Sequence, residues 1–141
     1  MIIYFGIGTN LGDREHNLST ALRLLDARVG TRMALSSIYR SQAQGFESEN
    51  DFANIVAVYA TGYSQEELLE ITQEIERQMG RTQKSVDGIY HDRVIDIDLL
   101  LAYDKDVSIT HQSATLTLPH PRMHERDFVM IPLSEVRRQL S

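Results

Sequence analysis

The sequence contains no cysteine among its 141 residues, and basic residues are scarce relative to acidic ones. The absence of cysteine excludes disulfide bonds, thiolate nucleophiles and zinc ribbons. No apolar run approaches the roughly 18 residues that a membrane-spanning helix needs, and the opening MIIYF carries no basic leader. These absences predict a cytoplasmic protein that does not associate with a membrane.

The charge balance disfavours nucleic acid as a partner. The chain has 14 lysines and arginines against 20 aspartates and glutamates, a net charge of −6, whereas binding to a polyanion needs a basic surface. Several basic residues nevertheless gather in the second half of the chain: Arg77, Arg81, Lys84, Arg93, Arg122 and Arg126. A local basic cluster in an acidic protein suits a small anion better than a duplex.

The length of 141 residues is typical of one domain. A chain of this size buries about two-thirds of its unfolded surface, so it needs no covalent staple to fold. Its 42% hydrophobic and 24% charged residues are ordinary for a globular protein. No repeat, low-complexity stretch or linker interrupts the sequence, and we predict a single domain over residues 1–141.

The hydrophobic patterns predict alternating strands and helices. β-branched and aromatic runs predict strands at 1–8, 31–40, 52–60 and 94–101, with one or two short strands within 107–118. Helical spacing of apolar residues predicts helices near 14–28 and 65–79, and short helical turns within 127–139. This order fits an α+β fold, a ferredoxin-like βαββαβ sandwich with helices packed on a mainly antiparallel sheet.

Both long helices carry sequence signals at their ends. Asp13 is placed to cap the first helix. Ser64 and Glu67 have the spacing of a capping box at the start of the second helix. Gly80 is expected to stop that helix.

Asp96 and Asp98 are the most unusual residues of the sequence, because both lie within an otherwise apolar strand. Residues two apart on a strand point to the same face, so the two carboxylates are expected to project together. Adjacent carboxylates repel unless a cation lies between them, and hard oxygen ligands suit Mg²⁺ that is shared with substrate phosphates. The alternative is a solvated acidic face, since short motifs often occur by chance.

Arg93 lies three residues before Asp96 and strengthens the magnesium interpretation. A planar guanidinium can hold phosphate oxygens through two hydrogen bonds, as a phosphate clamp requires. Arg93 could instead pair simply with Asp92 or Asp96. Taken alone, the residue leaves both interpretations open.

Residues 118–128 form a second polar motif, with the sequence LPHPRMHERDF. Its prolines fix the backbone, while its arginines and a histidine can reach phosphates or a ribose. We assign His120, Arg122 and Arg126 to function and interpret His124 as a solvated residue. The alternative for the whole motif is a rigid surface loop ahead of a helix.

Two further features have weaker signals. Gln73 and Glu76 share a face of the second helix, away from its apolar stripe, and such polar faces are usually only solvated. The run GTNLGD at 8–13 has neither the GxGxxG fingerprint nor a Walker lysine, so we interpret it as a turn.

The motifs follow one another along nearly the whole chain. They are GTNLGD at 8–13, DFAN at 51–54, ER at 76–77, GR at 80–81, Arg93 with Asp96 and Asp98, PHPRM at 119–123, Arg126, Phe128, and PL at 132–133. In this order they resemble the 6-hydroxymethyl-7,8-dihydropterin pyrophosphokinase family, whose members make the pterin diphosphate of the folate pathway from ATP. The D-x-D and P-H-P-R-M segments are the most specific parts of the resemblance.

The resemblance implies a catalytic set and a reaction. Asp96 and Asp98 would be the ligands of two Mg²⁺ ions that bridge the ATP phosphates and the acceptor hydroxymethyl group, with Arg81 and Arg93 completing the catalytic set. The hydroxymethyl oxygen would attack the β-phosphorus of ATP, and AMP would leave. Such transfer depends mainly on positioning and charge neutralisation, and two metals can steady the entering and leaving oxygens.

The resemblance also implies two sets of binding residues. Those expected at ATP are Gln73, Glu76, Arg81, Lys84, Arg93, Leu99, Thr117, His120 and Arg126. Those expected at the pterin are Ser41, Gln42, Gln44, Gly45, Phe52, Asn54, Tyr90, Asp96 and Phe128. The pterin ring would lie between Phe52 and Phe128, with Asn54 at its amide edge, and Tyr90 would take the place of an aromatic residue on a closing loop.

Two other functions compete with an active enzyme. A family member that has lost turnover could serve as a pterin- or nucleotide-binding module, although both carboxylates and the clamp arginine are present. The other alternative is a ferredoxin-like regulatory or RNA-binding domain, which would need exposed aromatic residues with basic residues on its sheet face, and no motif of that kind is visible. We expect a monomer that takes the two small-molecule substrates and binds no nucleic acid.

Overall fold

The computed structural model describes residues 1–41, 51–80 and 94–141. Several residues that the sequence assigns to the site lie outside these ranges: Gln42, Gln44, Gly45, Arg81, Lys84, Tyr90 and Arg93. Within the described ranges, no helix combines the length and the apolar composition that crossing a membrane requires.

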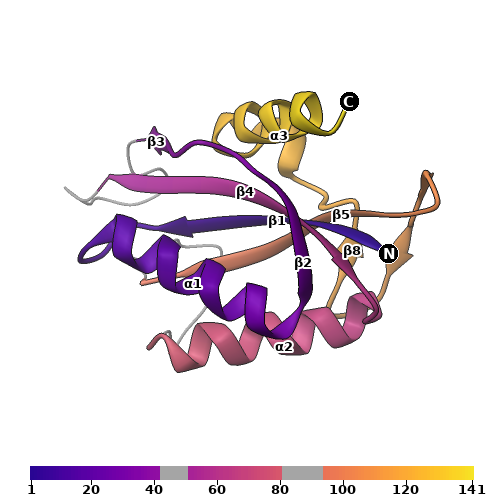
Figure 1. The fold of residues 1–141 in the computed structure, drawn as a ribbon, viewed down its shortest axis with the longest axis horizontal. Coiled ribbons are helices and arrows are strands. Elements are labelled where there is room, and N and C mark those ends of the chain that lie inside the picture. The colour runs from indigo at the N-terminus through magenta and orange to yellow at the C-terminus, as the bar shows by residue number, and fades with distance from the viewer. Residues whose placement is uncertain (42–50, 81–93) are drawn as a thin grey trace.

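An antiparallel sheet of six strands runs through the middle of the molecule (Figure 1). Its strands are β1 (Ile2–Thr9), β2 (Gly30–Leu35), β3 (Tyr39–Ser41), β4 (Phe52–Thr61), β5 (Asp96–Asp104) and β6 (Val107–Ser108). Their order is β2-β4-β1-β5-β6, and β3 also pairs with β4. Two further strands, β7 (His111–Gln112) and β8 (Thr117–Leu118), pair with each other outside this sheet. The central strand β1 pairs antiparallel with both of its neighbours, β4 and β5.

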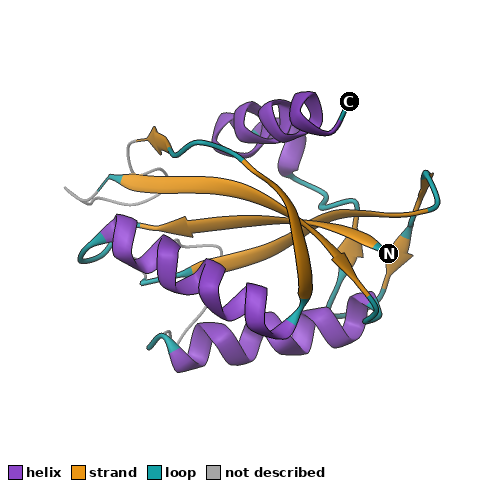
Figure 2. Ribbon diagram, in the orientation of Figure 1, coloured by secondary structure: helices purple, strands orange, loops and turns teal. Residues whose placement is uncertain are grey.

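Helices cover both faces of the sheet (Figure 2). The helices α1 (Arg14–Arg28) and α2 (Gln65–Gln78) lie on one face, here called the α1–α2 face. The helix α3 (Asp127–Leu140), preceded by the short 3₁₀ helix η1 (Met123–Glu125), lies on the other, here called the α3 face. The predicted ferredoxin-like arrangement is confirmed, with α3 added on the second face.

Alternation along β1 divides the core between the two faces. Ile3, Phe5 and Ile7 are at most 1% exposed and pack with α1 and α2. Tyr4 points the other way and packs with Val129 and Leu133 of α3. Because successive strand residues point to opposite faces, parity sets which helices a regularly paired residue meets, whereas at the bulge in β5 the adjacent Leu100 and Leu101 both pack on the α3 face.

The predicted strand at 31–40 is two strands in the structure. Ser36, between β2 and β3, donates its backbone N–H to the carbonyl oxygen of Val56 at 3.0 Å. Its hydroxyl in turn accepts the N–H of Val56 at 2.9 Å. A side-chain oxygen thus replaces a backbone acceptor, and the regular ladder is interrupted at that point.

The prediction of only short helical turns at the C-terminal end was wrong. Helix α3 has 14 residues and contains Pro132, although an interior proline costs a helix about 3 kcal/mol. The buried side of α3 consists of Val129, Pro132, Leu133 and Val136. Burying a large apolar side chain contributes about 1.5–3 kcal/mol, so this stripe together outweighs the cost of the proline.

Helix α3 also covers the open edge of β2. The side-chain amide of Gln139 donates to the carbonyl oxygen of Leu35 at 2.8 Å and accepts the Leu35 N–H at 3.3 Å. One turn earlier, Glu135 accepts hydrogen bonds from the hydroxyl of Ser37 and from its backbone N–H, the latter at 2.6 Å, and these two bonds from Ser37 hold the pKa of the Glu135 carboxyl below its usual range. The exposed backbone groups of an edge strand are thereby partly satisfied by side chains.

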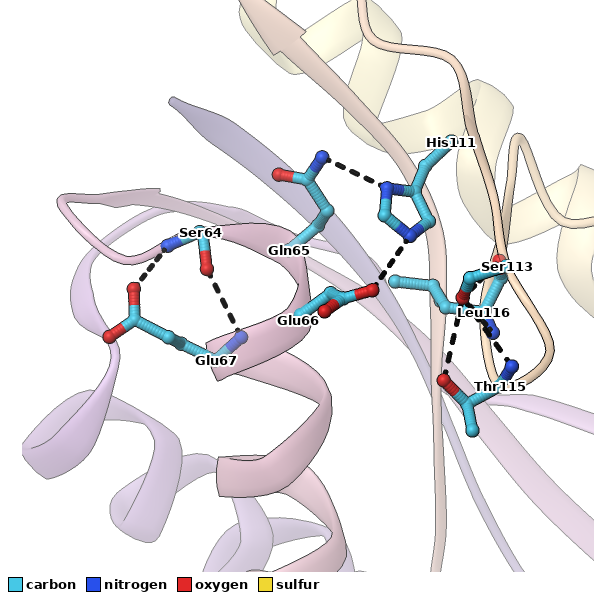
Figure 3. A network of polar contacts seen from close by, with 8 residues as sticks. All are labelled: Ser64, Gln65, Glu66, Glu67, His111, Ser113, Thr115 and Leu116. Atoms are coloured by element: carbon cyan, nitrogen blue, oxygen red, sulfur yellow. Dashed lines mark hydrogen bonds and ion pairs between the residues drawn. The ribbon is translucent and has the colours of Figure 1, made fainter.

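The start of α2 is fixed by side-chain hydrogen bonds (Figure 3). Ser64 Oγ accepts the N–H of Glu67 at 3.2 Å, and Glu67 Oε1 accepts the N–H of Ser64 at 3.0 Å. The imidazole of His111, on β7, lies within 3.2 Å of the Gln65 amide nitrogen and 3.1 Å of a Glu66 carboxylate oxygen. The predicted capping box is present, and His111 ties β7 to the same helix end.

Ser64→Ala should lower the free energy of unfolding by about 1 kcal/mol, because it leaves an N–H at the start of α2 without its acceptor. Urea denaturation followed by circular dichroism measures the change. Ser19→Ala is the matched control, since Ser19 is exposed within α1 and its loss should change stability by less than about 0.5 kcal/mol. Equal effects of the two substitutions would contradict the capping role.

Candidate functional site

Asp96 and Asp98 lie on the α3 face at the start of β5. The residues between and beside them, Ile95, Ile97 and Leu99, are at most 3% exposed and pack on the α1–α2 face. Leu100, two residues after Asp98, packs with the α3 cluster. The two carboxylates therefore share one face, as their spacing predicts, and both are half-buried.

Each carboxylate lies opposite a glycine of the central strand. Asp96 pairs with Gly8 and Asp98 pairs with Gly6 in the register of β1 and β5. Directly paired residues of antiparallel strands place their side chains on the same face. No β1 side chain therefore stands beside either carboxylate.

A buried carboxylate of α2 holds the strand between the two aspartates. Glu76 is 3% exposed, and its Oε2 accepts the backbone N–H of Ile97 at 2.8 Å. This bond satisfies a backbone group on the side of β5 that faces away from β1. Glu76, which the sequence assigned to ATP, thus has a direct role in placing Asp96 and Asp98.

The segment after β8 lies against the same strand. The backbone N–H of His120 donates to the carbonyl oxygen of Leu100 at 2.7 Å. Burial is the main cause that lowers the pKa of His120, and the positive charge of Arg126 is the second. The carboxylate of Asp96 raises the same pKa in part. Arg126 and Asp96 are therefore both close enough to His120 to influence it electrostatically.

The other charged residues of this motif, and His124, face solvent. Arg122 is exposed and pairs with Glu125 at 3.4 Å. His124 is exposed as well, in agreement with its interpretation as a solvated residue. Of the motif's polar residues, His120 and Arg126 are the two that the structure brings toward the carboxylates.

Of the residues expected at the pterin, Ser41, Phe52 and Asn54 lie together in the strand pairing at this end of the sheet. Ser41 pairs with Phe52, and Tyr39 pairs with Asn54. Because Phe52, Asn54 and the buried Val56 alternate along β4, all three point to the α3 face, where Val56 packs. Asn54 in turn pairs with Gly8, which joins this group to the strand beside Asp96.

Phe128 approaches from the start of α3. Its ring packs against the cluster on the α3 face, and the guanidinium of Arg126 lies 5.6 Å from the ring centroid. This distance is typical of a cation–π contact. The structure thus brings an aromatic ring and a basic group of one helix end to the face that carries the two aspartates.

Three residues of the expected ATP set lie apart from this group or contribute differently. Leu99 is 3% exposed in the core on the α1–α2 face, so a nucleoside could meet only its backbone. Thr117 is exposed on β8, and Gln73 is half-buried on α2.

The sequence pattern missed the role of Gly6 and Gly8 as the strand partners of Asp98 and Asp96, because register is not visible in either strand alone.

The chemistry of the described side chains fits a magnesium ion shared with a substrate. Among residues 1–41, 51–80 and 94–141, no group of three or more histidines, cysteines, aspartates and glutamates is arranged to hold a metal. Two carboxylates alone leave most positions of an octahedral ion to water and phosphate oxygens, as Mg²⁺ commonly has them. Asp96 and Asp98 are the residues that would hold it.

Comparison with known proteins identifies the same family as the motifs. Residues 4–138 match the model of the family described as 7,8-dihydro-6-hydroxymethylpterin-pyrophosphokinase (HPPK). A 2-amino-4-hydroxy-6-hydroxymethyldihydropteridine pyrophosphokinase of Porphyromonas gingivalis is 50% identical over 135 residues, which cover 96% of this chain and 90% of the relative. The Bacillus subtilis protein of that name is 37% identical over 140 residues, covering 99% of this chain and 80% of the relative.

A solved structure shares the fold. It is described as HPPK-DHPS in complex with substrates, and it superposes with a TM-score of 0.69 over 96% of this chain and 40% of that chain, at 16% identity. The folic acid synthesis protein FOL1 of Dictyostelium discoideum is 33% identical over 135 residues, covering 96% of this chain and 19% of that protein. Both are longer proteins in which a domain like this one is one part.

The lowered pKa of His120 predicts a pH dependence of stability. Its ordinary pKa is 6.5, so the unfolded chain binds a proton below that pH while the folded chain resists it. The stability that neutral His120 contributes is therefore complete above pH 6.5 and is lost as the pH falls from 6.5 toward the lower folded pKa.

His120→Gln removes this titration. As the pH falls from about 7.5 to about 5.5, one pH unit either side of the ordinary pKa, the parent should lose more unfolding free energy than the variant. Urea denaturation without nucleotide or metal measures both proteins. A difference that stays constant over this range would contradict the electrostatic environment described for His120.

Proposed function

The chain belongs to the 7,8-dihydro-6-hydroxymethylpterin-pyrophosphokinase family, and on that premise we propose that it transfers diphosphate from ATP to the hydroxymethyl group of 6-hydroxymethyl-7,8-dihydropterin, with release of AMP. It is a transferase of folate biosynthesis. The observation that carries the assignment is the pair Asp96 and Asp98 on one open face, beside His120 and Arg126. A site of this composition suits a small, highly anionic substrate.

The two aspartates are proposed to hold Mg²⁺, two ions in the full complex. Magnesium supplies charge neutralisation and orientation to the triphosphate when it is bound there. The half-buried position of both carboxylates supports this role, because partial burial strengthens their attraction for a cation. Glu76 supports it indirectly by fixing Ile97 between them.

Basic residues are proposed to neutralise the negative charge of the triphosphate that the metal leaves uncompensated. His120 and Arg126 are proposed to hold phosphate oxygens near Asp96, and their mutual proximity is visible in the lowered pKa of His120. Arg81, Lys84 and Arg93 are proposed to act with them. Gln73, Thr117 and the backbone at Leu99 are proposed contacts of the nucleoside.

The pterin is proposed to lie between Phe52 and Phe128. Two aromatic rings around a flat heterocycle supply stacking, and the Asn54 amide supplies a directional polar contact. Ser41 lies beside Phe52 in the strand pairing and would offer its backbone or hydroxyl. Gln42, Gln44, Gly45 and Tyr90 complete the proposed pterin set.

The reaction is a displacement at the β-phosphorus of ATP. The hydroxymethyl oxygen of the pterin forms a bond to that phosphorus, and the bond from the phosphorus to the oxygen shared with the α-phosphate breaks. AMP leaves with that electron pair, and the hydroxyl proton passes to solvent. The protein's part is to align the two oxygens and to balance the charge of the phosphates, because such transfer needs little covalent help.

The direct test mixes the chain with ATP, the pterin and Mg²⁺ and follows AMP by chromatography. Stoichiometric formation of AMP and pterin diphosphate is the expected result, lost on chelation of the metal and restored by added Mg²⁺. Binding of both substrates without AMP would instead identify a non-catalytic binding protein. That alternative is not favoured, because the relatives carry the name of the enzyme.

Asp96→Asn and Asp98→Asn should each lower kcat by about 10²-fold or more while the protein stays folded, since each removes a charge that the metal requires. Steady-state AMP formation measures kcat, and circular dichroism verifies the fold. Asp104→Asn is the matched control, because Asp104 is an exposed residue at the far end of the same strand. Near-parental kcat in both site variants would refute the metal role.

We also propose that residues 1–141 form one pyrophosphokinase domain that acts as a cytoplasmic monomer. The family match over residues 4–138 supports the single domain. Size-exclusion chromatography with light scattering tests the monomer, for which a mass near 16.1 kDa is expected. A concentration-independent dimer would overturn that part of the proposal.

A further inference from the structure

Gly8 lies between the proposed pterin-binding amide and a proposed metal ligand. In the sheet, Asn54 of β4 pairs with Gly8 of β1 on one side, and Asp96 of β5 pairs with Gly8 on the other. The three residues form one row across adjacent strands, and their side-chain positions share the α3 face. Gly8 thus occupies the centre of the row that joins the two halves of the site.

The requirement for glycine here is one of space. The described glycines with positive φ are Gly12, Gly30 and Gly80, so the backbone of Gly8 would suit other residues. A Cβ added to Gly8 would, however, lie only 2.4 Å from Oδ1 of Asn54. This separation is far below van der Waals contact, which means that the Asn54 amide occupies the place of the missing side chain.

The other end of that amide is buried without a partner. Asn54 is 7% exposed, and its Nδ2 finds no hydrogen-bond acceptor within the part of the chain that the structure describes. A buried donor left unpaired is destabilising, because it has lost its hydrogen bonds to water and gained none in return. The Asn54 amide is therefore held with an N–H donor that no described protein group accepts. A bound ligand could supply that acceptor.

We propose that Gly8 is a positioning residue for pterin recognition. By lacking a side chain it leaves room for Oδ1 of Asn54 over β1, and so it fixes the direction in which the Asn54 N–H donors face. The acceptor is a ring carbonyl or ring nitrogen of the heterocycle. This inference rests on the proposed function, because it assumes that the pterin binds beside Asn54.

The fold should tolerate a methyl group at this position. The atom nearest to the added Cβ is the end of the Asn54 side chain, and the next is Cγ of the same residue at 3.5 Å. A side-chain end can rotate away where backbone could not. In Gly8→Ala the amide should therefore turn, while β1 keeps its pairing with β4 and β5.

The experiment measures steady-state AMP formation with each substrate varied in turn. Gly8→Ala should raise the KM for the pterin about tenfold and leave the KM for ATP within about twofold of the parent value, a difference within ordinary substitution effects. Gly62→Ala is the matched control, because a Cβ at Gly62 has no atom within 4 Å. It should leave both KM values unchanged.

A double-mutant cycle separates positioning from general damage. If Gly8 acts through the Asn54 amide, Gly8→Ala should change the pterin kcat/KM by less than about twofold once Asn54→Ala is present, since the two residues form one unit. The inference would be overturned if the two substitutions lowered the pterin kcat/KM by independent factors that multiply in the double variant. It would also be overturned if Gly8→Ala lowered kcat/KM equally for ATP and pterin, or if it left the pterin KM unchanged.

The parent protein in the same assay tests the underlying function. If the parent forms AMP and Gly8→Ala matches its pterin KM, only the role of Gly8 is refuted. If the parent forms no AMP under any substrate and metal condition, the proposed function fails, and the inference about Gly8 fails with it.

Discussion

The pairing of β1 with β4 and β5 is the constraint on which the rest of the site depends. This register sets Asn54, Gly8 and Asp96 side by side in one row, and it sets Asp98 beside Gly6 in another. A shift by one residue would turn each of these side chains to the α1–α2 face. The apolar residues between them, such as Ile7 and Ile97, would then lose their place in the core, so hydrophobic burial protects the geometry of the polar residues.

Hydrogen bonds from outside the sheet secure the same strand. Glu76 of α2 accepts the N–H of Ile97, and the carbonyl oxygen of Leu100 accepts the N–H of His120. Glu76 precedes β5 along the chain and His120 follows it, so the two contacts come from segments that lie far apart in the sequence. They place residues of the proposed nucleotide site against β5, while α3 covers β4 and brings Phe128 to the proposed pterin site. Under the proposed function, one face of one sheet would serve both substrates.

Much of this arrangement could be predicted from local patterns, and the misses have physical causes. The capping box at Ser64, the cap at Asp13 and the shared face of Asp96 and Asp98 depend on residues a few positions apart. The length of α3 was missed because Pro132 is a helix breaker locally and is accepted only through burial against the sheet. The division of the second strand at Ser36 was missed because its partner, Val56, lies in another strand.

The sequence by itself determined the family, the alternation that directs the two aspartates to one side, and the order of strands and helices. Each of these depends on residue types and on spacing along the chain, which covalent geometry translates into direction. The tertiary structure alone decided that glycines stand opposite both aspartates and that the Asn54 amide fills the space above Gly8. It decided also that Glu76 holds Ile97. These are contacts between segments far apart in the chain, and only packing of the whole sheet with its helices selects one register among the alternatives.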